Sequence, residues 1–164
     1  MFYLPPRFAE EIIDHAKSEV PNEACGLLAG SGSWIVKHYR ATNSEHSPVL
    51  YSIDPKELLS FIRDMEAHDW DLLAIYHSHT HSHAYPSPTD VRQAYYPDSV
   101  YLIVSLEDPE HPVIRGFRIL DGAISEEEVV QPRWLRRLAG KVRLHGETLC
   151  RIVKRFFHSQ GAGA

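Results

Sequence analysis

Cysteine is scarce in this chain of 164 residues, which contains only Cys25 and Cys150. Two thiols so far apart in the sequence form neither a disulfide framework nor a thiolate zinc site, so we expect both to be reduced and buried. No apolar run approaches the roughly 20 residues that a membrane-spanning helix needs. The N-terminal residues also lack a basic stretch followed by an apolar one, as a secretory signal would have. We therefore expect a cytoplasmic protein without a membrane span.

Charge is unevenly distributed along the chain. Acidic residues outnumber basic ones, 22 to 17, which gives a formal net charge of -5. Residues 132–164 contain eight Lys and Arg residues but only one acid, a net charge of +7, so the preceding 131 residues carry -12. Such a split indicates either that the basic end docks on the acidic part or that it meets a polyanionic partner.

Three regions follow from these patterns. Residues 1–131 show no internal repeat and no flexible linker, and we interpret them as one domain. Residues 132–158 are predicted to form one or two basic amphipathic helices, and residues 159–164 a disordered tail. The helical prediction rests on an apolar stripe made of Leu135, Leu138, Val142, Leu149, Ile152, Val153 and Phe156. Because such a stripe is usually buried on protein, we favour docking on its own domain or in a homodimer over binding of nucleic acid or an anionic membrane.

Helical and strand patterns are mixed in residues 1–131. Pro5-Pro6 is typical of a helix start, and Phe8, Ile12, Ala16 and Val20 follow at helical spacing. Apolar runs predict strands at residues 25–30, 34–36, 49–53, 72–76, 100–106, 113–120 and 124–130. Further helix starts are indicated at Asp54-Pro55 and near Ser87. This mixture predicts an α+β fold with a mixed central sheet.

Histidines cluster in one short stretch. The chain has 11 histidines, and His77, His79, His81 and His83 fall within seven residues directly after the predicted strand 72–76. The simplest interpretation is a polar surface loop or a weak adventitious metal tract. The end of a buried strand is, however, where a rigid scaffold displays catalytic groups.

Two of these histidines are spaced to share a metal ion. Side chains one residue apart on an extended segment point the same way, so His77 and His79 can chelate one ion. Asp90, at the start of the next helix, would supply a third ligand. Zinc binds such nitrogen and oxygen atoms, and three protein ligands leave a fourth position for water, as in catalytic sites. An isolated HxH pair would be weak evidence for this site.

A longer pattern contains these residues. His77-Ser78-His79 is followed by seven residues, Ser87, two further residues and Asp90, and Glu23 stands upstream at the start of a predicted strand. The string H-S-H-x7-S-x2-D resembles the signature of the JAMM (MPN-plus) zinc metalloproteases. No other histidine in the cluster starts a matching string. The resemblance covers about residues 3–131 and implies a mixed, curved sheet flanked by helices, as in cytidine deaminases.

The same resemblance implies a role for each residue. His77, His79 and Asp90 would bind zinc, and Glu23 would be the general base toward the zinc-bound water. Ser87 would help to hold the water and stabilise the oxyanion. Simpler alternatives are a solvated acid at Glu23 and helix capping by Ser87 or Asp90. The two other histidines of the cluster, His81 and His83, match no ligand position, and we expect them to face solvent.

Further segments are similar to one bacterial subgroup of this family. They are residues 25–30, 42–48, 84–87 and 101–105. The subgroup removes a cysteine adduct from the C-terminal Gly-Gly of a ubiquitin-like sulfur-carrier protein, in a route to cysteine. The alternatives are a general JAMM isopeptidase that releases carrier proteins from lysine, a non-catalytic MPN scaffold, and a histidine-rich metal-handling protein. A scaffold typically lacks the ligands that are present here, and metal handling would leave Glu23 and Asp90 without a role.

Overall fold

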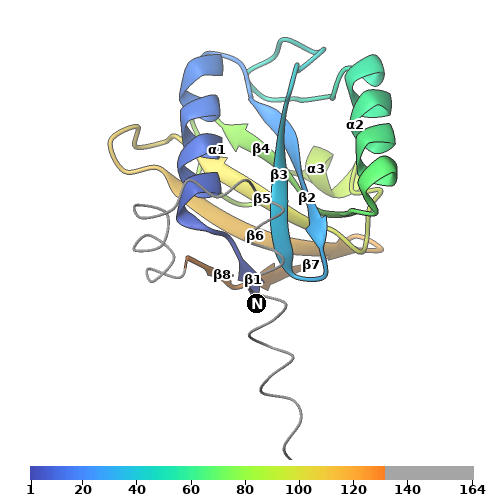
Figure 1. Cartoon of the computed structure of the whole chain (residues 1–164). Helices are drawn as coiled ribbons and strands as arrows, with labels where there is room; N and C mark the ends of the chain where they lie inside the picture. Colours follow the sequence, from blue (N-terminus) through green and yellow to red (C-terminus); the bar gives the residue numbers. More distant parts are fainter. Residues whose placement is uncertain (132–164) are drawn as a thin grey trace, which may run out of the picture.

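The computed structural model of the chain describes residues 1–131, in which a six-stranded sheet lies between helices (Figure 1). The predicted helices of residues 132–158 and the tail at 159–164 lie outside the described residues. The elements are β1 (Phe2–Tyr3), α1 (Pro6–Glu19), β2 (Cys25–Ser31), β3 (Trp34–Ala41), α2 (Pro55–His68), β4 (Asp71–His79), α3 (Pro88–Arg92), β5 (Val100–Ser105), β6 (Val113–Leu120), β7 (Ala123–Glu127) and β8 (Val129–Val130). No helix within this part of the chain is long and apolar enough to cross a membrane.

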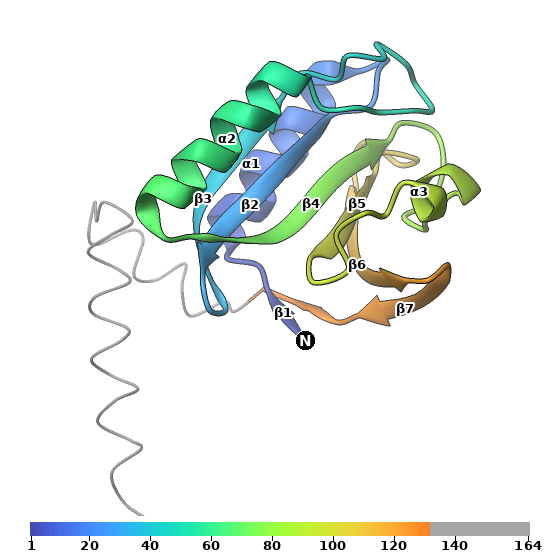
Figure 2. The same ribbon diagram turned by 90° about the vertical axis from the view of Figure 1, so that its right-hand side faces the viewer.

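The sheet has the strand order β3-β2-β4-β5-β6-β7. Strands β4 and β5 are parallel, and every other neighbouring pair is antiparallel. Figure 2 shows the sheet bending from β4 towards β7. The predicted α+β fold with a mixed, curved sheet is confirmed.

Each face of the sheet has its own apolar core. Helix α1 covers one face, where Phe8 and Ile12 pack with Leu28, Ala74 and Tyr76. Helices α2 and α3 cover the other face, and the second core contains Leu27, Tyr39, Met65, Ile75 and Phe117. Because successive side chains on a strand point to opposite faces, β2 and β4 contribute alternately to the two cores. Both central strands are accordingly buried on both sides, as their nearly continuous apolar runs predicted.

The helix signals in the sequence mark real helix starts. Helix α1 begins at Pro6, and the Asp54 side chain accepts hydrogen bonds from the backbone N–H groups of Lys56 and Glu57 at the start of α2. On α1, Phe8, Ile12 and Ala16 are buried as predicted. Val20, by contrast, is 50% exposed, because the helix ends at Glu19.

Two strand predictions were wrong. Residues 49–53 form no strand, and only Ile53 makes an isolated bridge, with Asn43. Instead of joining the sheet, this segment bonds to the loop after β3: the Leu50 carbonyl accepts from Nδ2 of Asn43, and the Ser52 carbonyl accepts from the backbone N–H of Ser44. The predicted strand 124–130 is divided into β7 and β8, and β8 pairs in parallel with β1, a strand that sequence reasoning missed.

Candidate metal centre and active site

The register of the sheet brings the predicted site residues to one face. In β4, Ile75 points into the core under α2, so His77 and His79, two and four residues later, lie on the same face. In β2, Cys25 lies directly opposite His77, and Glu23 precedes Cys25 by two residues. Asp90 comes from α3, which covers this face. Three separate elements therefore meet at the end of β4.

The two histidines and Asp90 form a compact group of ligand atoms. The Nε2 atoms of His77 and His79 are 3.1 Å apart. Oδ1 of Asp90 lies 3.4 Å from Nε2 of His77, and its Oδ2 lies 3.5 Å from Nε2 of His79. These are the one group of three or more His, Cys, Asp or Glu residues within residues 1–131 whose ligand atoms lie close enough to share a metal ion.

The three distances fit a zinc ion. Tetrahedral zinc with bonds of about 2.0–2.1 Å places its ligand atoms about 3.3–3.4 Å apart, close to the three separations found here. Two imidazole nitrogens at 3.1 Å would also repel each other if both carried bare lone pairs with no cation or proton between them. Both the donor set and its spacing therefore suit zinc, with one coordination position left for a reactant.

The two histidines are held in different ways. Nδ1 of His79 lies 3.1 Å from the His83 carbonyl oxygen, which makes it an N–H donor and leaves the Nε2 lone pair for a metal. The His77 ring is stacked on Tyr51 at 4.5 Å, and its Nδ1 is buried without a hydrogen-bond partner among the described residues. Burial lowers the pKa of His77 despite the opposing charge of Asp90, so His77 is held neutral. For His79, hydrogen bonds and charges from Asp90, His83 and Glu23 outweigh burial and raise the pKa.

Asp90 is fixed by the start of its own helix. The Ser87 side chain accepts from the backbone N–H of Asp90 at 3.2 Å, and Oδ2 of Asp90 accepts from the backbone N–H of Ser87 at 2.6 Å. This reciprocal capping box orients the carboxylate towards the histidines. Burial alone would raise the pKa of Asp90, but hydrogen bonds from His77 and His79 hold it well below its usual range, so the ligand is ionised.

Glu23 is a buried carboxyl group beside these ligands. It is 5% exposed, and its backbone is fixed on both sides. Its N–H donates to the Ser47 carbonyl, and its C=O accepts from Nδ2 of Asn43, both at 2.9 Å. Burial, together with the negative charge of Asp90, raises its pKa to about 7, although His79 opposes the shift. A carboxyl group with such a pKa can gain and lose a proton at neutral pH, as a general base must.

The structure thus brings together His77, His79 and Asp90, places Glu23 at their side, and puts Ser87 on the helix cap next to Asp90. His81 and His83 are exposed, as expected. Cys25 is buried as a free thiol, and Cys150 lies outside the described residues.

Sequence reasoning missed the segment of residues 47–51. Its carbonyl groups accept from the Glu23 N–H and from Oγ1 of Thr80, and the ring of Tyr51 covers His77. The segment therefore connects Glu23 to the strand end that carries His77 and His79. Its sequence signals were the similarity of residues 42–48 to the bacterial subgroup and the aromatic Tyr51 next to that polar stretch, and neither indicated these contacts.

The fold and the site are those of a JAMM-type hydrolase: one face of an α+β sheet carries two histidines and an aspartate that could hold a metal ion, with a buried glutamate beside them. The model of the prokaryotic homologs of the JAB domain matches residues 5–119. The chain belongs to this family, which confirms the resemblance found in the sequence.

Individual relatives agree with this membership. The CysO-cysteine peptidase of Mycobacterium tuberculosis is 45% identical over 120 residues, which cover 72% of this chain and 82% of that protein. The desampylase of Haloferax volcanii is 35% identical over 103 residues, 58% of this chain and 74% of that protein. The solution structure of protein DSY2949 from Desulfitobacterium hafniense has a TM-score of 0.72 at 39% identity, and the match covers 80% of this chain and 92% of that one.

Proposed function

We propose that this protein is a zinc-dependent hydrolase of the JAMM class that cleaves the amide bond after the C-terminal Gly-Gly of a ubiquitin-like sulfur-carrier protein and releases cysteine. The observation that carries the chemistry is the group of His77, His79 and Asp90, spaced for zinc, with the buried Glu23 carboxyl beside it. The substrate is supported by the 45% identical relative that is named CysO-cysteine peptidase.

The ligand set determines what the metal contributes. The neutral imidazoles of His77 and His79 and the ionised Asp90 would hold the ion. Zinc in such a site lowers the pKa of water to about 7 and polarises a carbonyl group.

Glu23 moves the proton in the proposed reaction. Hydrolysis adds OH to the carbonyl carbon of the scissile amide and a proton to its nitrogen, and the C–N bond breaks. Glu23 takes the proton from the attacking water and delivers it to the leaving nitrogen, which departs as an amine. A pKa of about 7 suits both directions of transfer, because the group is a usable base before attack and a usable acid after it.

The Ser87 hydroxyl is available as a hydrogen-bond donor to the oxyanion. In the capping box its oxygen acts as an acceptor for the Asp90 N–H, so the hydroxyl hydrogen is not used by the cap. That hydrogen can donate to the oxygen on which negative charge develops during attack. Capping and oxyanion stabilisation are therefore compatible at this one residue.

Mass spectrometry of a defined substrate tests the proposal. A sulfur-carrier protein bearing a C-terminal cysteine, incubated with the zinc-loaded protein, should lose one cysteine residue and keep its Gly-Gly end. The matched control is the same protein after its metal has been removed with a chelator. The second candidate is a general isopeptidase, which is supported by the similarity to a desampylase. Cleavage of a lysine-linked carrier but not of the cysteine adduct would favour this candidate. Cleavage of neither would point to a non-catalytic scaffold.

The partner of the basic segment is a separate proposal. Residues 132–158 would pack on the acidic domain or on a second copy of the chain to form a homodimer. The charges of +7 and -12 on the two parts support this over binding of nucleic acid.

A further inference from the structure

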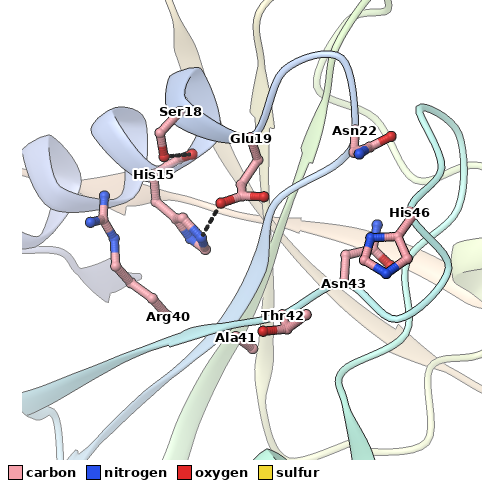
Figure 3. Close-up of a pocket in the computed structure, with 9 residues that line it drawn as sticks. All are labelled: His15, Ser18, Glu19, Asn22, Arg40, Ala41, Thr42, Asn43 and His46. Atoms are coloured by element: carbon pink, nitrogen blue, oxygen red, sulfur yellow. Dashed lines mark hydrogen bonds and ion pairs between the residues drawn. The ribbon is translucent and has the colours of Figure 1, made fainter.

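A polar cavity of about 310 Å³ lies on the α1 side of the sheet, away from the metal ligands. The end of α1, the loop before β2, the end of β3 and the loop after β3 form its wall, which includes His15, Glu19, Arg40 and Asn43 (Figure 3). Cavities of about 300 Å³ and more are typical of small-molecule sites. None of its lining residues belongs to the proposed metal site.

A chain of hydrogen bonds leads to this cavity from the surface of α1. Oε2 of Glu11 lies 3.0 Å from Nδ1 of His38, and Nε2 of His38 lies 2.9 Å from the hydroxyl oxygen of Tyr76. The same hydroxyl oxygen lies 2.7 Å from Nδ1 of His15. Tyr76 is fully buried, and the side chain of His15 is 6% exposed. The last atom of the chain is Nε2 of His15, which faces the cavity wall beside Glu19 (Figure 3).

Counting protons settles the direction of these bonds. Three contacts must be filled, and two neutral imidazoles and one phenol supply three protons. The carboxylate of Glu11 only accepts, so Nδ1 of His38 donates to it. Tyr76 then donates to Nε2 of His38, and Nδ1 of His15 donates to Tyr76. Nε2 of His15 is therefore left with a bare lone pair.

This lone pair faces a second acceptor. Oε1 of Glu19 lies 3.6 Å from Nε2 of His15, beyond hydrogen-bond distance. If all three bonds ran in the opposite direction, Nδ1 of His38 would carry no proton and would face the Glu11 carboxylate. Their separation of 3.0 Å is too short for two acceptors with no proton between them. At the cavity wall, Nε2 of His15 and the Glu19 carboxylate are therefore two neighbouring hydrogen-bond acceptors with no donor between them. Burial and the neighbouring charge of Arg40 lower the pKa of His15 to about 4, so His15 does not supply the proton itself at neutral pH.

A positive group stands on the other side of His15. Figure 3 shows Arg40 and Glu19 flanking the imidazole. The Arg40 guanidinium makes no hydrogen bond or ion pair with any other residue in the described part of the chain, although its charge is felt by His15 and Tyr76. A guanidinium in such a position is suited to a carboxylate.

We propose that this cavity binds a small free α-amino acid. Its ammonium group would donate to Nε2 of His15 and to the Glu19 carboxylate, and its carboxylate would bind the guanidinium of Arg40. His15 and Glu19 would bind the positive group, and Arg40, on the neighbouring strand, would bind the negative group. A ligand that carries both charges would therefore bind more tightly than a simple amine or a simple acid. The cavity has space for about ten water molecules at about 30 Å³ each, which is enough for the six or more heavy atoms of such a ligand.

The site borders on the catalytic machinery without overlapping it. Asn43 lines the cavity, and its Nδ2 donates to the backbone carbonyls of Glu23 and Leu50. The cavity therefore shares one wall residue with the segment that fixes the proposed base.

Nuclear magnetic resonance of the zinc-loaded full-length chain tests the assignment. L-alanine is the probe, because it has no thiol to compete for zinc. Titration should shift backbone amide signals of residues 15–22 and 40–46. Imidazole ¹⁵N spectra should show Nε2 of His15 unprotonated before addition and shifted afterwards. Methylammonium and acetate, each offering one half of the ligand, should bind at least tenfold more weakly.

Variants separate this site from general charge effects. Glu19→Gln and Arg40→Met should each weaken L-alanine binding by tenfold or more. The controls Asp14→Asn, on the same helix, and Arg63→Met, on α2, remove one exposed charge each and should leave it unchanged. Equal binding of methylammonium and L-alanine, or shifts confined to His77 and His79, would overturn the proposal. The readout is binding, so the result is independent of whether the proposed hydrolysis occurs.

Discussion

Cys25 of β2 and His77 of β4 lie directly opposite each other in the antiparallel pair. Side chains opposite each other point to the same face, so Glu23, two residues before Cys25, also lies on the face of His77 and His79. A register slip by one residue would turn Glu23 to the α1 side of the sheet. The pairing of these two central strands therefore decides whether the proposed base lies beside the proposed metal ligands.

We expect one zinc ion per chain, bound by His77, His79 and Asp90. His77→Ala should abolish stoichiometric zinc, because two remaining ligands do not hold the ion. The double change His81→Ala and His83→Ala should retain it, since the His83 contact to His79 uses only the backbone carbonyl. Elemental analysis of the purified proteins checks both results. Unchanged zinc in the His77 variant would disprove the ligand assignment.

Glu23→Gln should separate metal binding from chemistry. Glutamine has nearly the same shape but cannot take up a proton, so the variant should fold and keep zinc while losing nearly all turnover. Steady-state kinetics on the cysteine adduct, with zinc measured on the same sample, provides the test. Turnover at the parent rate would show that Glu23 is only a buried acid.

Ser87→Ala should slow the reaction by about 100-fold or more, the usual cost of one oxyanion donor. Loss of the helix cap should also lower the free energy of unfolding by about 1 kcal/mol. Ser87→Thr is the matched control, since it keeps the hydroxyl for both roles. If the slower rate of Ser87→Ala were fully explained by its smaller folded fraction, Ser87 would act only as a helix cap.

Acid should destabilise the protein partly through His15. Its pKa is lowered from 6.5 to about 4 in the folded state, so between these values the unfolded state binds more protons and stability falls with the pH. From pH 7.5 to 4.5 this group should account for a loss of about 2–3 kcal/mol in the free energy of unfolding. Urea denaturation at the two pH values should show a smaller loss for His15→Gln. An equal loss in both proteins would mean that His15 is protonated in the fold.

Deletion of residues 132–164 should leave zinc binding intact, because all proposed ligands precede this segment. If the basic segment docks on the acidic domain or on a second copy, the truncated protein should melt at a lower temperature or change from dimer to monomer. Light scattering and thermal melts at low and high salt measure both effects. Unchanged mass and melting, with loss of salt-sensitive binding to nucleic acid or anionic lipid, would favour an external partner instead.

The grouping of His77, His79 and Asp90 could be predicted because its pattern is local. His77 and His79 share one strand, and Asp90 and Ser87 share one helix start, so their spacing matches the motif of the family that the chain resembles. The family and the α+β fold were confirmed, whereas the roles of these residues and the boundary at residue 131 stay predictions. Glu23 came only from the family resemblance, since an isolated glutamate carries no signal for burial.

Other features depend on tertiary contacts that sequence periodicity does not contain. The apolar residues of 49–53 predicted a strand, but the Leu50 and Ser52 carbonyls accept hydrogen bonds from Asn43 and Ser44 in the loop after β3 rather than from a neighbouring strand. The polar cavity is likewise built from α1, β3 and the loops that follow these two elements. Neither His15 nor Arg40 stands in a motif, so only the packing of α1 on the sheet reveals them.

The pairing of β1 with β8 affects how the domain would respond to mechanical force. The two strands are parallel, with hydrogen bonds from the Phe2 N–H to the Glu128 carbonyl and from the Leu4 N–H to the Val130 carbonyl. Pulling Met1 and Gln131 in opposite directions would load these bonds in shear, so they would break together instead of opening one after another. The first barrier to stretching the domain from Met1 and Gln131 is therefore the pairing of β1 with β8, and the sheet that carries the proposed metal ligands would bear the force only after this pairing has broken.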